Sequence, residues 1–167
     1  PHARIAAVAT AYPPYILDQS EVVERSREMF APDVPGFERF TEAYRNAAID
    51  TRHSCVPIDW YSQPHPFSER NDLFIENAVD LLAEVAEKLF AEAGIKASDV
   101  DGLVVVSTTG IATPSLDALL LERLSFRRDV QRLPIFGLGC GGGVTGLARA
   151  AQMAMTRPDS CVLFLVV

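Results

Sequence analysis

The stretch FGLGCGGGVTGLARAA, residues 136–151, places one cysteine among glycines, where an apolar run gives way to a helical pattern of small residues. A short apolar run that ends in glycines and continues as a helix indicates a strand-to-helix turn in an α/β protein. Such a turn suits two chemistries. Its glycine-rich backbone can hold a phosphate, or its cysteine can act as a nucleophile.

The phosphate interpretation rests on Gly137, Gly139 and Gly142, which fit the G-x-G-x-x-G fingerprint of dinucleotide-binding domains. Two observations weigh against it. The fingerprint normally opens its domain, whereas two predicted strands precede it here, and it needs an acidic residue at the end of the next strand. Asp159 is at a suitable distance but comes before that strand.

The nucleophile interpretation explains the cysteine as well as the glycines. A thiol at a strand-to-helix turn lies beside unsatisfied backbone N–H groups and the positive end of the helix dipole, and both favour thiolate over thiol. Glycines at 139, 141, 142 and 143 remove side chains that would crowd the sulfur of Cys140. A small, inert packing residue is the alternative, and the residues alone leave the two open. Cys55 and Cys161 fit the packing role better.

Outward from this turn, the pattern predicts alternating strands and helices. We expect strands at 103–107, 133–139 and 161–167, helices at 115–126 and 142–155, and an earlier helix over 72–93 that ends at Gly94. This order predicts a largely parallel sheet covered by helices.

The first part of the chain is less regular. RIAAVAT, residues 4–10, predicts a buried strand, and a helix capped by Asp18 or Ser20 follows to about Phe30. A second helix is expected over 36–48. Residues 52–68 hold three prolines without periodicity and predict a long loop.

Length and composition limit the function classes. The 167 residues suit one domain spanning 1–167, and the apolar run at 161–167 ends without a turn, so we expect the polypeptide to continue past Val167. A net charge of −7 argues against nucleic acid or an anionic membrane as the main partner. The apolar runs are too short to span a bilayer, and three widely spaced cysteines suggest a reduced, cytoplasmic protein.

Four segments carry a family resemblance. GLGCGGGVTGLARAA (137–151) resembles the active-site segment of bacterial type III polyketide synthases, relatives of chalcone and stilbene synthases. Other segments resemble the same family in the same order: residues 1–24, AIDTRHSC (48–55) and VVVSTTGIATPSLDALL (104–120). The resemblance implies a thiolase-like layered α/β fold and a homodimer. It also implies decarboxylative condensation of malonyl-CoA onto an acyl-CoA starter, with coenzyme A thioesters as substrates and with no cofactor or metal.

The same resemblance implies roles for particular residues. Cys140 would take the starter as a thioester. Thr108, Thr109 and Thr113 match the loop that lines the acyl or cyclisation cavity, and Thr113 replaces a larger methionine of the plant enzymes, which favours longer starters. Arg39 and Arg45 match a helix that meets the phosphates of coenzyme A, although Glu38 and Glu42 make a solvated charged face an equal alternative. The matching histidine and asparagine of the family lie downstream of the cysteine, where this sequence has neither.

Three rival functions remain open at this point. A ketoacyl-ACP synthase III has the same fold and a cysteine, but usually a bulky residue soon after it, where this chain has glycines. A nucleotide-binding module would use the glycine turn, and a non-catalytic thiolase-like half would serve only in assembly. We interpret four arginines in the second half of the chain as surface residues: Arg123, Arg127, Arg128 and Arg132.

Overall fold

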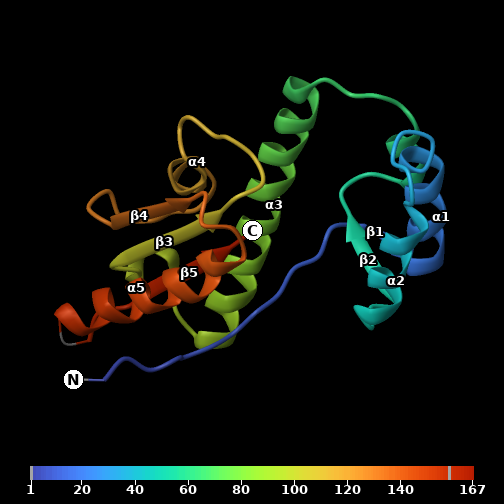
Figure 1. The fold of residues 1–167 in the computed structure, drawn as a ribbon. Coiled ribbons are helices and arrows are strands. Elements are labelled where there is room, and N and C mark those ends of the chain that lie inside the picture. Colours follow the sequence, from blue (N-terminus) through green and yellow to red (C-terminus); the bar gives the residue numbers. More distant parts are fainter. Residues whose placement is uncertain (1, 158) are drawn as a thin grey trace. The chain divides into compact units, whose positions relative to one another are not determined.

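The computed structural model describes residues 2–157 and 159–167, and it divides into two compact units (Figure 1). One unit contains the residues up to Ala11 together with Phe67–Val167, and the other contains Tyr12–Pro66. The first is built on a sheet and the second on two helices and a strand pair.

A three-stranded parallel sheet in the order β4-β3-β5 forms the centre of the first unit. Its strands alternate along the chain with helices, which confirms the predicted pattern. The bounds are α3 (Phe67–Ala93), β3 (Gly102–Ser107), α4 (Leu116–Arg123), β4 (Gln131–Phe136), α5 (Gly142–Thr156) and β5 (Val162–Val166).

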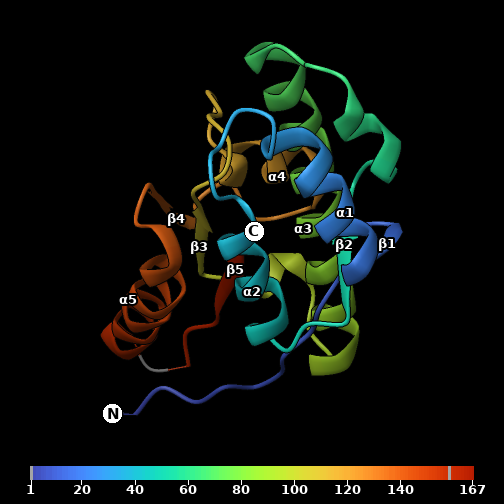
Figure 2. The same cartoon turned by 45° about the vertical axis from the view of Figure 1, so that its right-hand side comes forward.

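The two faces of this sheet carry different helices (Figure 2). Leu103 and Val105 of β3 join Leu163 and Leu165 of β5 in the main apolar core with α3 and α4. Val106 of β3 contacts the opposite helix, α5. Every residue of β3 is buried because this central strand is covered on both faces, as its unbroken apolar sequence indicates.

Helix α3 begins five residues earlier than the apolar pattern indicates, at Phe67 rather than residue 72. Its end is as predicted: Gly94 has a φ of +67°, a conformation that only glycine adopts readily, and the Ile95 N–H donates to the Phe90 carbonyl oxygen.

Asp101 ties together the amino ends of all three strands. It stands directly before β3. Its carboxylate accepts a hydrogen bond from the N–H of Cys161 (2.9 Å), just before β5, and another from the side chain of Arg127 (2.9 Å), just before β4. Arg157 adds an ion pair of 3.1 Å. This end of the sheet therefore has its polar groups satisfied by residues of the chain itself.

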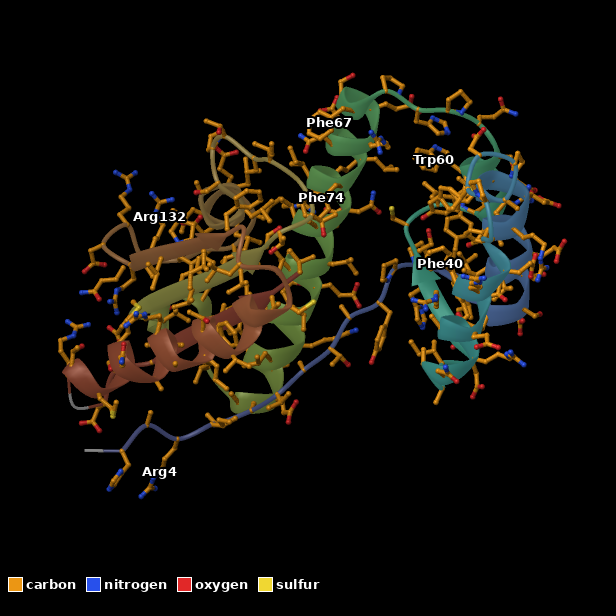
Figure 3. The ribbon with its side chains drawn as sticks, viewed as in Figure 1. Arg4, Phe40, Trp60, Phe67, Phe74 and Arg132 are labelled. Atoms are coloured by element: carbon orange, nitrogen blue, oxygen red, sulfur yellow. The ribbon has the colours of Figure 1, made fainter. Side chains whose placement is uncertain are left out.

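The second unit is held by a pair of strands and by contacts between its two helices. Strands β1 (Tyr15–Asp18) and β2 (Thr51–Ser54) pair antiparallel, and α1 (Gln19–Phe30) and α2 (Glu38–Asn46) pack beside each other. Asp18 caps α1 by accepting from the Ser20 N–H at 2.8 Å, as predicted. Phe37 is buried, whereas Phe40 is 59% exposed (Figure 3).

Two predictions for the first 68 residues are wrong. Residues 4–10 form no strand, and Ile5 and Val8 are 72% and 70% exposed, because no neighbouring backbone among the described residues offers this segment a hydrogen-bonded ladder. The predicted loop over 52–68 instead contains part of β2 and a 3₁₀ helix at Ile58–Ser62. Trp60 of this helix stacks on His65, which follows the helix, with ring centroids 3.7 Å apart.

Candidate active site

Cys140 lies in the turn between β4 and α5, within a short 3₁₀ helix at Gly139–Gly141, and its side chain is exposed. The turn depends on glycine at two positions, since Gly137 and Gly139 have φ values of +82° and +56°. Side chains at these positions would strain the backbone. The sequence therefore folds locally so that the cysteine stands free of the sheet.

Two further glycines set the distance between α5 and the sheet. A Cβ on Gly142 would lie 2.8 Å from Val106 Cγ1, and one on Gly146 would lie 2.6 Å from both Val106 and Phe164. The expectation that Gly142 clears space around the sulfur is therefore corrected, because its missing side chain makes room for the sheet. Gly141 and Gly143 have no atom within 4 Å of a Cβ and leave the surroundings of the turn open.

Among the described residues, no side chain caps the N-terminus of α5, and none in its first turn offsets the partial positive charge there. Its N-cap residue, Gly141, provides no side-chain hydrogen bond, and its first turn holds no acidic residue. Backbone N–H groups at such a position have no partner within the helix and can stabilise a negative charge. Cys140 thus lies immediately before this helix N-terminus, whose first N–H, that of Gly142, donates to the Gly139 carbonyl oxygen of the preceding 3₁₀ helix.

The loop after β3 borders a cavity of about 310 Å³. The residues that line it belong to β3, to the loop after β3, to the first turn of α4 and to the second half of β4. They include Ser107, Gly110, Ile111, Ala112 and Phe136. The three threonines expected at the cavity belong to this loop, but Thr108, Thr109 and Thr113 are exposed and are not lining residues of this cavity. Their role in substrate binding stays a prediction.

Two polar groups of this cavity were missed by sequence reasoning. Asp117 is fully buried, and among the described residues neither its carboxylate oxygens nor the Ser107 hydroxyl has a hydrogen-bond partner. The Arg132 guanidinium lies 3.1 Å from the carboxylate as an ion pair, so this arginine is not simply a surface residue. The only available signal was an acidic residue in the first turn of a helix, which is also common at exposed sites.

The other two cysteines lie in different surroundings. Cys161 is half-buried at the amino end of β5, and burial, followed by the nearby carboxylates of Asp101 and Asp99, raises the pKa of its thiol. Cys55 belongs to the second unit and is also half-buried. All three cysteines are free, and Cys140 is the exposed one.

Arg39 and Arg45, the expected contacts of coenzyme A, lie on α2 in the second unit and are exposed. Arg45 pairs with Glu42 at 3.4 Å. Six residues along a helix amount to roughly 120° around its axis, so the two side chains leave different faces of α2. The proposed contact with coenzyme A stays a prediction.

Within residues 2–157 and 159–167, no group of three or more histidine, cysteine or acidic side chains is placed to hold a metal ion. No helix in the same residues has the length and apolarity needed to cross a bilayer.

The parallel sheet between helical layers and the exposed cysteine at a strand-to-helix turn fit the class of thiolase-like condensing-enzyme folds that the family resemblance implies. The sequence family described as "Chalcone and stilbene synthases, N-terminal domain" matches residues 1–167. The chain therefore belongs to the chalcone and stilbene synthase family and corresponds to its N-terminal domain.

Individual relatives agree with this assignment. The chain is 36% identical over 166 residues to a putative chalcone synthase of Bacillus subtilis, covering 96% of this chain and 46% of the relative. It is 37% identical over 165 residues to the 1,3,6,8-tetrahydroxynaphthalene synthase of Streptomyces peucetius, covering 98% and 43%. The chain thus spans a little under half the length of these curated relatives.

A solved structure of a family member has a similar fold. The 1,3,6,8-tetrahydroxynaphthalene synthase of Streptomyces coelicolor, a bacterial type III polyketide synthase, superposes with a TM-score of 0.83 at 27% identity, covering 93% of this chain and 46% of that one. The predicted thiolase-like fold is confirmed. These relatives support neither a ketoacyl-ACP synthase III nor a nucleotide-binding module. The position of Asp159 also argues against nucleotide binding, because it lies before β5, whereas the fingerprint needs an acidic residue after the strand.

Proposed function

We propose that the protein containing this chain is a type III polyketide synthase that condenses an acyl-CoA starter with malonyl-CoA, with Cys140 as the acyl carrier. The observation that carries the proposal is the exposed Cys140 at the uncapped N-terminus of α5, in a chain of this family. A cysteine that must reach a bulky thioester has to be accessible; Cys140 is exposed, whereas Cys55 and Cys161 are half-buried.

The residues of this chain supply the loading step. The Cys140 thiolate attacks the carbonyl carbon of the acyl-CoA thioester, and the oxyanion that forms is stabilised by backbone N–H groups at the start of α5. The oxyanion then collapses, the bond to coenzyme A breaks, and coenzyme A leaves as a thiolate that takes up a proton. The acyl group remains on Cys140 as a thioester.

Extension requires further groups. Decarboxylation of malonyl-CoA generates an enolate, and each donor aimed at such a developing charge contributes about 3 to 4 kcal/mol to transition-state stabilisation. The family resemblance places a histidine and an asparagine in this role, downstream of the cysteine, and residues 141–167 contain neither. The step that the residues of this chain support is therefore the capture of the starter by Cys140.

The remaining parts of the proposal concern partners and compartment. Acyl-CoA and malonyl-CoA are the proposed substrates, with Arg39 and Arg45 contacting the coenzyme A phosphates and the loop threonines contacting the acyl chain. We propose a cytoplasmic homodimer that needs no metal or additional cofactor. The free state of all three cysteines supports a reducing compartment.

The test is mass spectrometry of the full-length protein after incubation with a medium-chain acyl-CoA. We expect a mass increase equal to one acyl group on the peptide that contains Cys140, and no increase in Cys140→Ala. Cys161→Ala serves as the matched control and should acylate as the wild type does. An unmodified wild-type protein, or an adduct that persists in Cys140→Ala, would overturn the proposal.

A further inference from the structure

The loop that lines the cavity is held by a side chain far from it in the sequence. Asn71 of α3 donates from Nδ2 to the Ile111 carbonyl oxygen at 2.9 Å, and the Ile111 N–H donates to Asn71 Oδ1 at 2.8 Å. One amide side chain thus satisfies both backbone polar groups of Ile111, in the way a neighbouring strand would. Among the described residues, residues 108–114 form no other hydrogen bonds.

A second contact from the same helix secures the neighbouring residue. Gly110 is buried against the ring of Phe74, and a Cβ on this glycine would overlap the ring. Figure 3 shows Phe74 on α3, three residues after Asn71, so both side chains leave the same face of the helix. Helix α3 therefore fixes the loop at two consecutive residues.

These two loop residues are part of the cavity wall. Gly110 and Ile111 line it together with Ala112, opposite Phe136 of β4. Since the rest of the loop lacks its own hydrogen bonds, the position of Ile111 depends on Asn71, and the width of the cavity depends on the position of Ile111.

We propose that Asn71 is a positioning residue that determines which acyl chains the cavity accepts. The inference rests on the proposed function, because it takes as the acyl site this cavity, whose lining includes Phe136, the last residue of β4 before the Cys140 turn. Asn71 does not touch the reacting atoms; it acts through the backbone of Ile111. Its amide provides both the donor and the acceptor that this backbone needs, and neither alanine nor aspartate provides both.

Two variants and a matched control test the proposal in the full-length protein. Asn71→Ala removes both hydrogen bonds, and Asn71→Asp keeps the acceptor and loses the donor. The control is Asn77→Ala on the same helix, because Asn77 donates to the Leu73 carbonyl oxygen within α3 and does not reach the loop.

The first readout is hydrogen exchange at the Ile111 amide. We expect exchange about tenfold faster in Asn71→Ala, as the loss of a hydrogen bond predicts, and wild-type exchange in Asn77→Ala. Equal exchange in wild type and Asn71→Ala would show that the loop is held by something else and would overturn the proposal.

The second readout is the rate of Cys140 acylation across a series of acyl-CoA chain lengths. We expect the ratio of kcat/KM for the longest and shortest starters to change by about tenfold in Asn71→Ala, the scale of one methylene in an apolar pocket, and by less in Asn71→Asp. A purely structural role would lower all chain lengths by the same factor and leave the ratio unchanged, which would overturn the proposal. Wild-type protein that does not acylate at all would instead overturn the proposed function.

Discussion

The two ends of the sheet differ in how their polar groups are satisfied. At the amino end, the Asp101 carboxylate accepts hydrogen bonds from the Cys161 N–H and the Arg127 side chain and pairs with Arg157, so its charge is compensated within the chain. At the carboxyl end, the Ser107 hydroxyl has no hydrogen-bond partner among the described residues, and the Asp117 carboxylate has an ion pair with Arg132 but no hydrogen bond. Helix α5 begins without a side-chain cap, and Cys140 is exposed. The amino end of the sheet therefore contributes to stability, whereas the carboxyl end has polar groups that a ligand can bind.

The largest expected effect compares the two cysteines at these opposite ends. With iodoacetamide at neutral pH, Cys140 should react completely while Cys161 stays largely unmodified. Burial and nearby carboxylates raise the Cys161 pKa and reduce its thiolate fraction, so we expect a rate at least about tenfold lower. Peptide mapping of the alkylated, folded protein checks this. Similar rates in the native protein would remove the distinction between the two ends.

The second prediction tests the buried carboxylate of the cavity. Arg132→Ala should lower the free energy of unfolding by about 3 kcal/mol, because it removes the charged partner that the fully buried Asp117 has among the described residues. Arg123→Ala is the matched control, since Arg123 and Asp80 form an exposed pair and should contribute less than about 1 kcal/mol. Urea denaturation measures both. Equal losses would mean that Asp117 is compensated by another group.

The third prediction concerns the packing below the cysteine. Gly146→Ala should destabilise the protein by about 1 to 3 kcal/mol, because the added Cβ would lie 2.6 Å from Val106 and Phe164. Gly143→Ala adds the same methyl group in the same helix with no atom within 4 Å, and should be neutral or stabilising by up to about 1 kcal/mol. Thermal unfolding of the pair provides the test. If both variants changed the stability by the same amount, contact with the sheet would not explain the glycine at position 146.

The smallest effect is the pH dependence of the amino end. The hydrogen bond from the Cys161 N–H, and then that from Arg127, lower the pKa of Asp101 below its usual 3.8. Because the folded-state pKa is the lower one, this contribution to stability is complete well above pH 3.8 and is lost as the pH falls through 3.8 and then through the folded-state value.

Asp101→Asn should therefore be less stable than the wild type at neutral pH, and the difference should shrink between about pH 5 and pH 1. Denaturation curves at a series of pH values measure this difference. A difference that stayed constant over the acid range would contradict the assigned cause.

The sheet and its helices were predictable from the sequence because their signals are local. The unbroken apolar run of β3, the small-residue pattern of α5 and the glycine after α3 each identify an element without reference to the rest of the chain. The segment at 4–10 has the same apolar signal but no partner strand among the described residues, and composition does not reveal a missing neighbour. Strands β1 and β2 were missed because four-residue strands with polar residues show little periodicity.

The candidate site was predictable only in part, for a related reason. Cys140 stands in a contiguous glycine motif that can be recognised in the sequence alone. Asn71 lies 40 residues from Ile111, and Asp117 meets Arg132 only because α4 packs beside β4. Contacts of this kind follow from the tertiary fold and leave no pattern in a single sequence.

The packing of α5 has a practical consequence for directed evolution. Gly142 and Gly146 contact the sheet and set how deeply the helix is seated, and hence where the sulfur stands, although neither side-chain position faces the open side of the turn. A saturation library around the thiol should therefore spare these two codons and randomise Gly141 and Gly143. Diversity introduced at 142 or 146 would mostly yield misplaced helices, and screening effort would be spent on folding defects in place of altered substrate scope.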